Sequence, residues 1–145
     1  MYRIKKIRYG LLPGLLAAAC MAGACGKKNA VFVMKAVTLD LYIQKDTLPA
    51  QDLFIRIVDT GDASVLAQTD KYKSGQTLPA TFNLEPHPEI QLYRQDDISL
   101  QLWGDSSGYL AARTIDLKEY TILFPIDIEA GSDSVRFSVK GSWRK

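Results

Sequence analysis

The chain has two cysteines, Cys20 and Cys25, and their surroundings decide what chemistry they can do. Both lie in an apolar stretch, 11–24, that follows a basic N-terminus containing Arg3, Lys5, Lys6 and Arg8. A basic segment, an apolar segment and small residues at its end are the layout of a secretory signal. The apolar stretch is shorter than the roughly 20 residues of a transmembrane helix. A disulfide or a metal site is not expected here, because no further cysteine exists and no His or Asp lies nearby.

The segment Ala22-Gly23-Ala24-Cys25 resembles the lipobox of bacterial lipoproteins. That resemblance implies a diacylglyceryl group on the Cys25 thiol, cleavage just before Cys25, and acylation of the new N-terminus. The sequence departs from the family at Ala22, where Leu is preferred. Cys20 is the alternative lipidation site, but Cys25 leaves a longer apolar region and is followed by polar residues. A plain secretory signal with incidental cysteines also remains open.

These features divide the chain into a helical signal peptide at 1–24, a lipidated tether at 25–30 and a folded domain at 31–145. The lipoprotein resemblance implies a location in the cell envelope, anchored in the outer membrane, on either its periplasmic or its surface face. The four basic residues before Cys25 account for the net charge of +2, since 14 basic and 16 acidic residues follow them. No basic patch with interleaved aromatic residues follows Cys25, so a nucleic-acid partner is not expected.

The folded part of the chain shows apolar residues at every second position. Val37, Leu39, Leu41 and Ile43 alternate with polar residues, and the same pattern recurs around 53–58, 98–103, 122–128 and 135–143. A period of two predicts half-buried strands, and Pro125 favours an edge position for its strand. Turn residues separate these runs. The sequence therefore predicts an all-β fold, an antiparallel β-sandwich of about eight strands.

The order of segments from 37 to 118 resembles that of C2 domains. The stretch from Asp46 to Asp52, followed by Leu-Phe-Ile-Arg-Ile, is similar to the first acidic loop and strand of that family. Thr77 to Phe82 and the strand around 98–103 fall at similar places. This resemblance implies a C2-like sandwich and, at its loops, calcium-dependent lipid binding.

The calcium ligands that the resemblance implies are Asp46, Asp52 and Asp105. Ca²⁺ takes six to eight oxygens, and three acids leave such a site degenerate. The alternative is that all three are turn and strand-start residues. We therefore expect no cofactor beyond the covalent lipid on the N-terminal cysteine.

No enzyme signature is present, so catalysis is not expected. His87, the only histidine, lies between two prolines, and no nucleophile motif accompanies it. Asp96 and Asp97 are not expected to act as a catalytic pair, because neighbouring residues of a strand point to opposite faces. The Gly104 to Gly108 segment lacks the G-x-S-x-G pattern.

Several aromatic residues fall on the outward positions of the predicted strands. Trp103, Tyr109 and Trp143 form a candidate contact surface, with Tyr42 and Phe54 as further members. A cluster of them would bind a protein partner or a sugar ring, whereas scattered aromatic residues need no function.

Two functions follow from these observations. The first is a lipid-anchored structural or protein-interaction module with an envelope protein as partner, for example an accessory part of a secretion or envelope assembly. The second is a C2-like module that binds calcium and phospholipid, or carbohydrate, at its loops.

Overall fold

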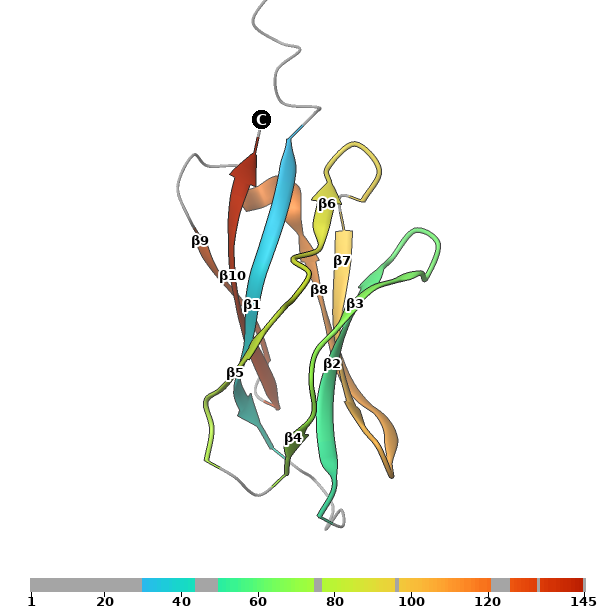
Figure 1. Cartoon of the computed structure of the whole chain (residues 1–145), viewed down its shortest axis with the longest axis vertical. Coiled ribbons are helices and arrows are strands. Elements are labelled where there is room, and N and C mark those ends of the chain that lie inside the picture. Colours follow the sequence, from blue (N-terminus) through green and yellow to red (C-terminus); the bar gives the residue numbers. More distant parts are fainter. Residues whose placement is uncertain are drawn as a thin grey trace, which may run out of the picture.

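The computed structural model describes residues 30–43, 50–74, 77–95, 97–120, 126–132 and 134–144. These residues form ten strands in two antiparallel sheets that pack face to face (Figure 1). The predicted all-β sandwich is confirmed. The predicted signal peptide and both cysteines lie outside the described residues. Within the described part of the chain, no helix is long and apolar enough to cross a membrane.

The first sheet has the strand order β5-β1-β10-β9, with β6 also paired to β1. Its strands are β1 (Val31–Tyr42), β5 (Ala80–Asn83), β6 (Glu89–Gln91), β9 (Ile126–Gly131) and β10 (Val135–Arg144). The end of the order places β9 at an edge of the sheet, as predicted for this strand. Pro125, on which that prediction rested, lies outside the described residues.

The second sheet has the order β3-β2-β7-β8, with β4 also paired to β2. Its strands are β2 (Asp52–Asp59), β3 (Val65–Gln68), β4 (Tyr72–Lys73), β7 (Asp97–Gly104) and β8 (Gly108–Asp116). A 3₁₀ turn, η1 (Leu117–Tyr120), follows β8. The short strands β4 and β6 were not predicted, because two or three residues carry no readable alternation.

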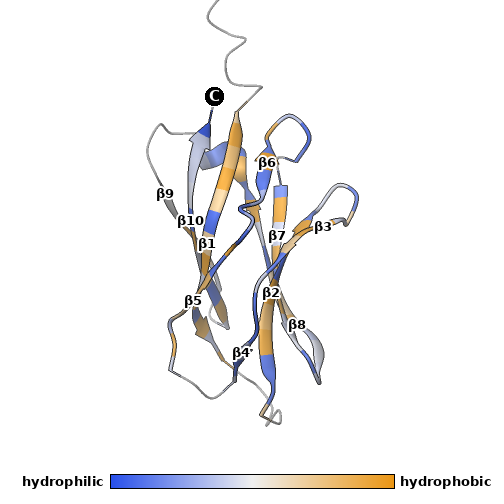
Figure 2. Cartoon of the chain, viewed as in Figure 1, coloured by the Kyte–Doolittle hydropathy of each residue, from blue (hydrophilic) through white to orange (hydrophobic). Residues whose placement is uncertain are grey.

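The core lies between the two sheets. Inward residues of β2 and β7 meet Phe32, Phe137 and Val139 of the other sheet in one buried cluster. Figure 2 shows the apolar residues of β1, β2 and β7 in orange. Each fully buried side chain of this size contributes about 1.5–3 kcal/mol relative to its exposed state, so this cluster is the main source of stability.

The alternation predicted for 37–43 holds only for its first half. Val37 and Leu39 are buried, but the prediction that Leu41 and Ile43 face the core is wrong. A register shift lies between Leu39 and Leu41, so that Leu41 pairs with exposed Arg136 and Tyr42 pairs with buried Val135. Tyr42 packs on the core, and Ile43 is 52% exposed. One extra residue in a strand reverses the faces of all residues after it.

We predict that Gly141→Ala destabilises the sandwich. A Cβ at Gly141 would lie 2.3 Å from Cζ of buried Phe32 and 2.7 Å from the carbonyl oxygen of Val33. Inserting a methyl group into a packed core costs about 1–3 kcal/mol, and the carbonyl belongs to the paired strand β1. Urea unfolding of the variant should show this loss.

Lys140→Ala is the matched control, because Lys140 is the exposed neighbour on the same strand. Its free energy of unfolding should stay within about 0.5 kcal/mol of the parent chain. Equal losses in the free energy of unfolding for Gly141→Ala and Lys140→Ala would contradict the close packing of Gly141 against Phe32.

Candidate interaction surface

Trp103 and Tyr109 lie together on the outer face of the second sheet. They are direct partners across β7 and β8, and their ring centroids are 5.7 Å apart with an interplanar angle of 77°. A register shift makes this pairing possible. Because Leu102 pairs with Ala111 and Trp103 with Tyr109, Leu110 is the extra residue. The bulge thus places an aromatic ring, instead of the Leu110 side chain, opposite Trp103.

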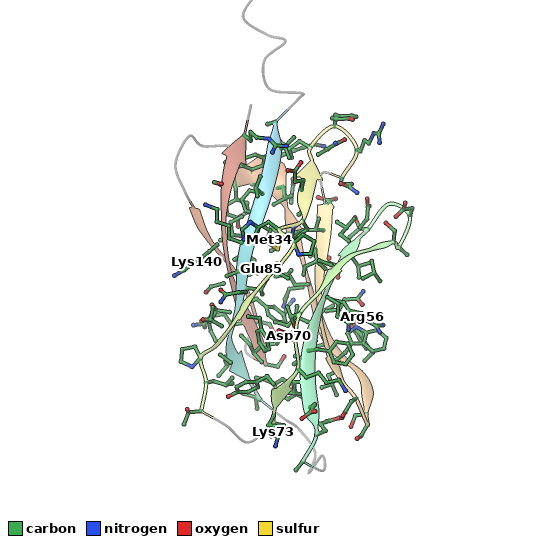
Figure 3. All side chains as sticks on the ribbon, viewed as in Figure 1. Met34, Arg56, Asp70, Lys73, Glu85 and Lys140 are labelled. Atoms are coloured by element: carbon green, nitrogen blue, oxygen red, sulfur yellow. The ribbon has the colours of Figure 1, made fainter. Side chains whose placement is uncertain are left out.

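Arg56 completes the cluster from the neighbouring strand β2. Its guanidinium carbon lies 4.4 Å from the centroid of the Trp103 ring and 5.3 Å from that of Phe54. Phe54 pairs directly with Trp103, so Arg56 is the diagonal neighbour of the indole. Figure 3 shows Arg56 on the side of β2 that faces away from the first sheet. A cation over an aromatic face is attracted by the ring quadrupole.

Two glutamine side chains hold the cluster in place. Arg56 Nε donates to Gln68 Oε1 at 2.9 Å, and Trp103 Nε1 donates to Gln101 Oε1 at 3.0 Å. Gln68 and Gln101 flank Arg56 on β3 and β7, since both pair with it across the sheet. Tyr109 is 56% exposed, and Phe54 is buried beneath its neighbours. We call Phe54, Arg56, Trp103 and Tyr109 the aromatic surface.

Trp143, the third residue of the predicted contact surface, does not belong to this cluster. It lies on β10 of the first sheet, where its ring packs 5.0 Å from that of Phe32. Its Nε1 donates to the carbonyl oxygen of Tyr120 at 2.9 Å. Trp143 thus closes one end of the core, and Tyr42 packs on the core as well.

Two of the three predicted calcium ligands are adjacent. The Asp52 amide donates to Asp105 Oδ1 at 3.1 Å, and the Asp105 amide donates to the Asp52 carbonyl at 2.9 Å. Ser106 Oγ donates to the same Oδ1, and Lys71 Nζ lies 3.7 Å from Oδ2. Both carboxylate oxygens of Asp105 thus already have protein partners. Asp46 lies outside the described residues.

This arrangement fixes the β7–β8 turn. Buried Gln51 accepts a hydrogen bond from the Ser107 amide at 3.0 Å, and its side chain fills the space beside Gly104. A Cβ at Gly104 would lie 2.1 Å from Gln51 Oε1, so any other residue there would displace the Gln51 side chain. This geometry supports the alternative hypothesis that Asp105 is a turn residue and not a calcium ligand, because its carboxylate closes the turn onto β2.

Several opposing influences act on the pKa of the Asp105 carboxyl. Burial alone would raise this pKa, but the Asp52 amide, Ser106 and the Lys71 ammonium together lower it below its usual value. The carboxylate is therefore the form that the folded state prefers.

The other candidate residues are dispersed. His87 is exposed, and Asp96 lies outside the described residues. Across the described ranges, no three His, Cys, Asp or Glu side chains are grouped so that they could hold a metal ion. A polar recess of about 320 Å³ is lined by Gln68, Asp70, Asn83 and Glu85.

Arg56 was missed in the sequence, although the signal for it was present. Leu53, Ile55 and Ile57 alternate along the strand and belong to the core cluster. Phe54 and Arg56 between them therefore share the outer face. The proximity of Arg56 to Trp103 depends on the pairing of β2 with β7, which cannot be deduced from the alternation within either strand. Comparison with known proteins adds no further guide, since no protein family and no curated protein matches the sequence.

We predict that Asp105→Asn lowers the melting temperature at neutral pH. Because the pKa of Asp105 is lowered on folding, its carboxylate stabilises the fold above the unfolded-state pKa of about 3.9. This stabilisation disappears as the pH falls through the folded-state pKa. Thermal melts from pH 7 to pH 2 should show a gap between parent and variant that closes in acid.

Glu119→Gln provides the control, because it removes one negative charge from an exposed residue of η1. A gap for Asp105→Asn that stays constant at every pH would show that its carboxylate has no special stabilising role.

Proposed function

We propose that this chain is a lipid-anchored envelope protein whose β-sandwich binds another envelope protein through the aromatic surface. The observation that carries this proposal is the cluster of Arg56 with Trp103 and Tyr109 on an outer sheet face. Aromatic residues and arginine are the side chains most enriched among those that dominate binding energy at protein interfaces. Such a module has no catalytic role, in keeping with the absence of enzyme motifs from the sequence.

The position of the aromatic surface supports a partner away from the anchoring membrane. β1 begins at Val31, which pairs with Arg144, whereas the β7–β8 turn lies at the opposite end of the sandwich (Figure 1). A strand of 12 residues spans about 40 Å. A tether at 25–30 would hold the first end near the membrane and direct the second end outward.

The same geometry argues against the phospholipid alternative. Asp52 and Asp105 lie at the outward end, far from the start of β1, so the anchoring membrane would not reach them in an upright orientation. Calcium would also have to displace Lys71 from Asp105. A tethered protein-binding module, as in an accessory subunit of a secretion or envelope assembly, fits these features better.

Photo-cross-linking in intact envelopes tests the protein partner. A benzophenone amino acid at Tyr109, the most exposed ring of the surface, should give a discrete higher-mass adduct on illumination. The same probe at Lys140, on the outer face of the other sheet, should give none. Failure to form any protein adduct from Tyr109, with the chain folded and in the membrane fraction, would refute the proposed function.

A second prediction concerns the anchor. Cys25→Ser should abolish incorporation of labelled palmitate and release the chain from the membrane fraction, because the thiol is the acceptor of the lipid. Cys20→Ser should leave both unchanged. The reverse result would move the anchor to Cys20, and labelling of neither parent nor variants would refute the lipoprotein assignment.

A further inference from the structure

The hydrogen bonds within the aromatic surface leave it with donors to offer a partner. Nε–H of Arg56 and Nε1–H of Trp103 can only donate, so Gln68 and Gln101 must turn their carbonyl oxygens toward them. The orientation of both amides is therefore fixed by chemistry. Within the described ranges, neither NH₂ group donates to another side chain, so both can serve a partner.

Arg56 contributes the largest share of these donors. A guanidinium has five N–H groups, of which one is used by Gln68. Among the described residues, no carboxylate forms an ion pair with Arg56. The guanidinium is held over Trp103 and is only partly exposed, so its side chain is already ordered for binding.

A partner that fits this surface must offer a negatively charged oxygen acceptor next to apolar groups. A carboxylate can accept two parallel N–H bonds from one guanidinium, and bonds between charged groups are about twice as strong as neutral ones. The exposed ring of Tyr109 lies beside Trp103 and offers an apolar contact next to this position. An aspartate or glutamate next to an apolar side chain would satisfy both parts.

We propose that the aromatic surface recognises an acidic segment of the partner protein, with a carboxylate bound to Arg56. This inference rests on the proposed function and adds the chemistry of the partner. An acidic sugar is the weaker candidate, since sugar rings stack on open aromatic faces, whereas the guanidinium of Arg56 lies over the Trp103 ring.

The two tryptophans of the chain allow a direct test by ¹⁹F NMR. Fluorotryptophan labelling of the full chain in detergent gives one signal from Trp103 and one from Trp143. Trp143 packs against Phe32 on the other sheet and serves as an internal reference. The probe is the peptide acetyl-Glu-Glu-Leu-Asp-Glu-Leu-amide, compared with the same peptide carrying Gln and Asn in place of Glu and Asp.

We expect the acidic peptide to shift the Trp103 signal in a saturable titration and to leave the Trp143 signal in place. The amide peptide should bind at least about tenfold more weakly, as expected for loss of hydrogen bonds to a charged group. Arg56→Gln should weaken the acidic peptide by a similar factor. Arg94→Gln is the matched control, because Arg94 also lies over an aromatic ring, 5.2 Å from that of Tyr93, and should leave binding unchanged.

Equal affinity for the two peptides, or no shift of Trp103 with either, would overturn the inference. A shift of Trp103 by oligogalacturonate alone would replace the acidic protein segment by an acidic sugar. Cross-linking from Tyr109 separates these results from failure of the proposed function. A protein adduct without acidic-peptide binding refutes the carboxylate partner only, whereas absence of the adduct refutes the protein partner itself.

Discussion

The antiparallel register between β2 and β7 determines both the core and the outer surface of the second sheet. One set of pairs, including Ile55 with Leu102 and Ile57 with Leu100, is buried between the sheets. The alternate pairs, Phe54 with Trp103 and Arg56 with Gln101, lie on the opposite face. A slip of one residue would expose the first set and bury the guanidinium. The large energetic cost of exposing the core therefore also holds the aromatic surface together.

β-Bulges in β1 and β8 change the face of the sheet on which the following side chains lie. β1 has two extra residues, Lys35 and Asp40. The Asp40 carboxylate accepts a hydrogen bond from Ser138, and Tyr42 after it lies on the core side. In β8 the extra residue Leu110 places Tyr109 beside Trp103. Bulges of this kind commonly redirect side chains at sheet edges and next to sites. The aromatic surface thus depends on one regular pairing and one local irregularity.

Alternating apolar residues were enough to predict the all-β sandwich and its long strands, because burial of one face imposes a period of two. The same reasoning failed at Leu41 and Ile43, since nothing in the local pattern marks Asp40 as an extra residue. Trp103 and Tyr109 could be selected because the alternation of apolar residues assigns aromatic residues of these strands to outward positions. The placement of Arg56 over Trp103, and of Trp143 against Phe32, depends on pairing between distant strands. The pattern of residues within one strand does not show which distant strand it pairs with.

One edge of the second sheet, strand β8, is poorly suited to pairing with another chain, whereas the outer face next to it carries the aromatic surface. β8 is one of the two edge strands of this sheet, and β3 is the other. Arg113 of β8 pairs with buried Leu100, which places the arginine on the core side. Arg113 Nε is buried without a hydrogen-bond partner among the described residues. An inward-facing charge on an edge strand opposes pairing with another chain, at some cost in stability. A partner that approaches the β7–β8 side of the sheet therefore contacts side chains instead of adding a strand to β8, and the aromatic surface presents an ordered set of them.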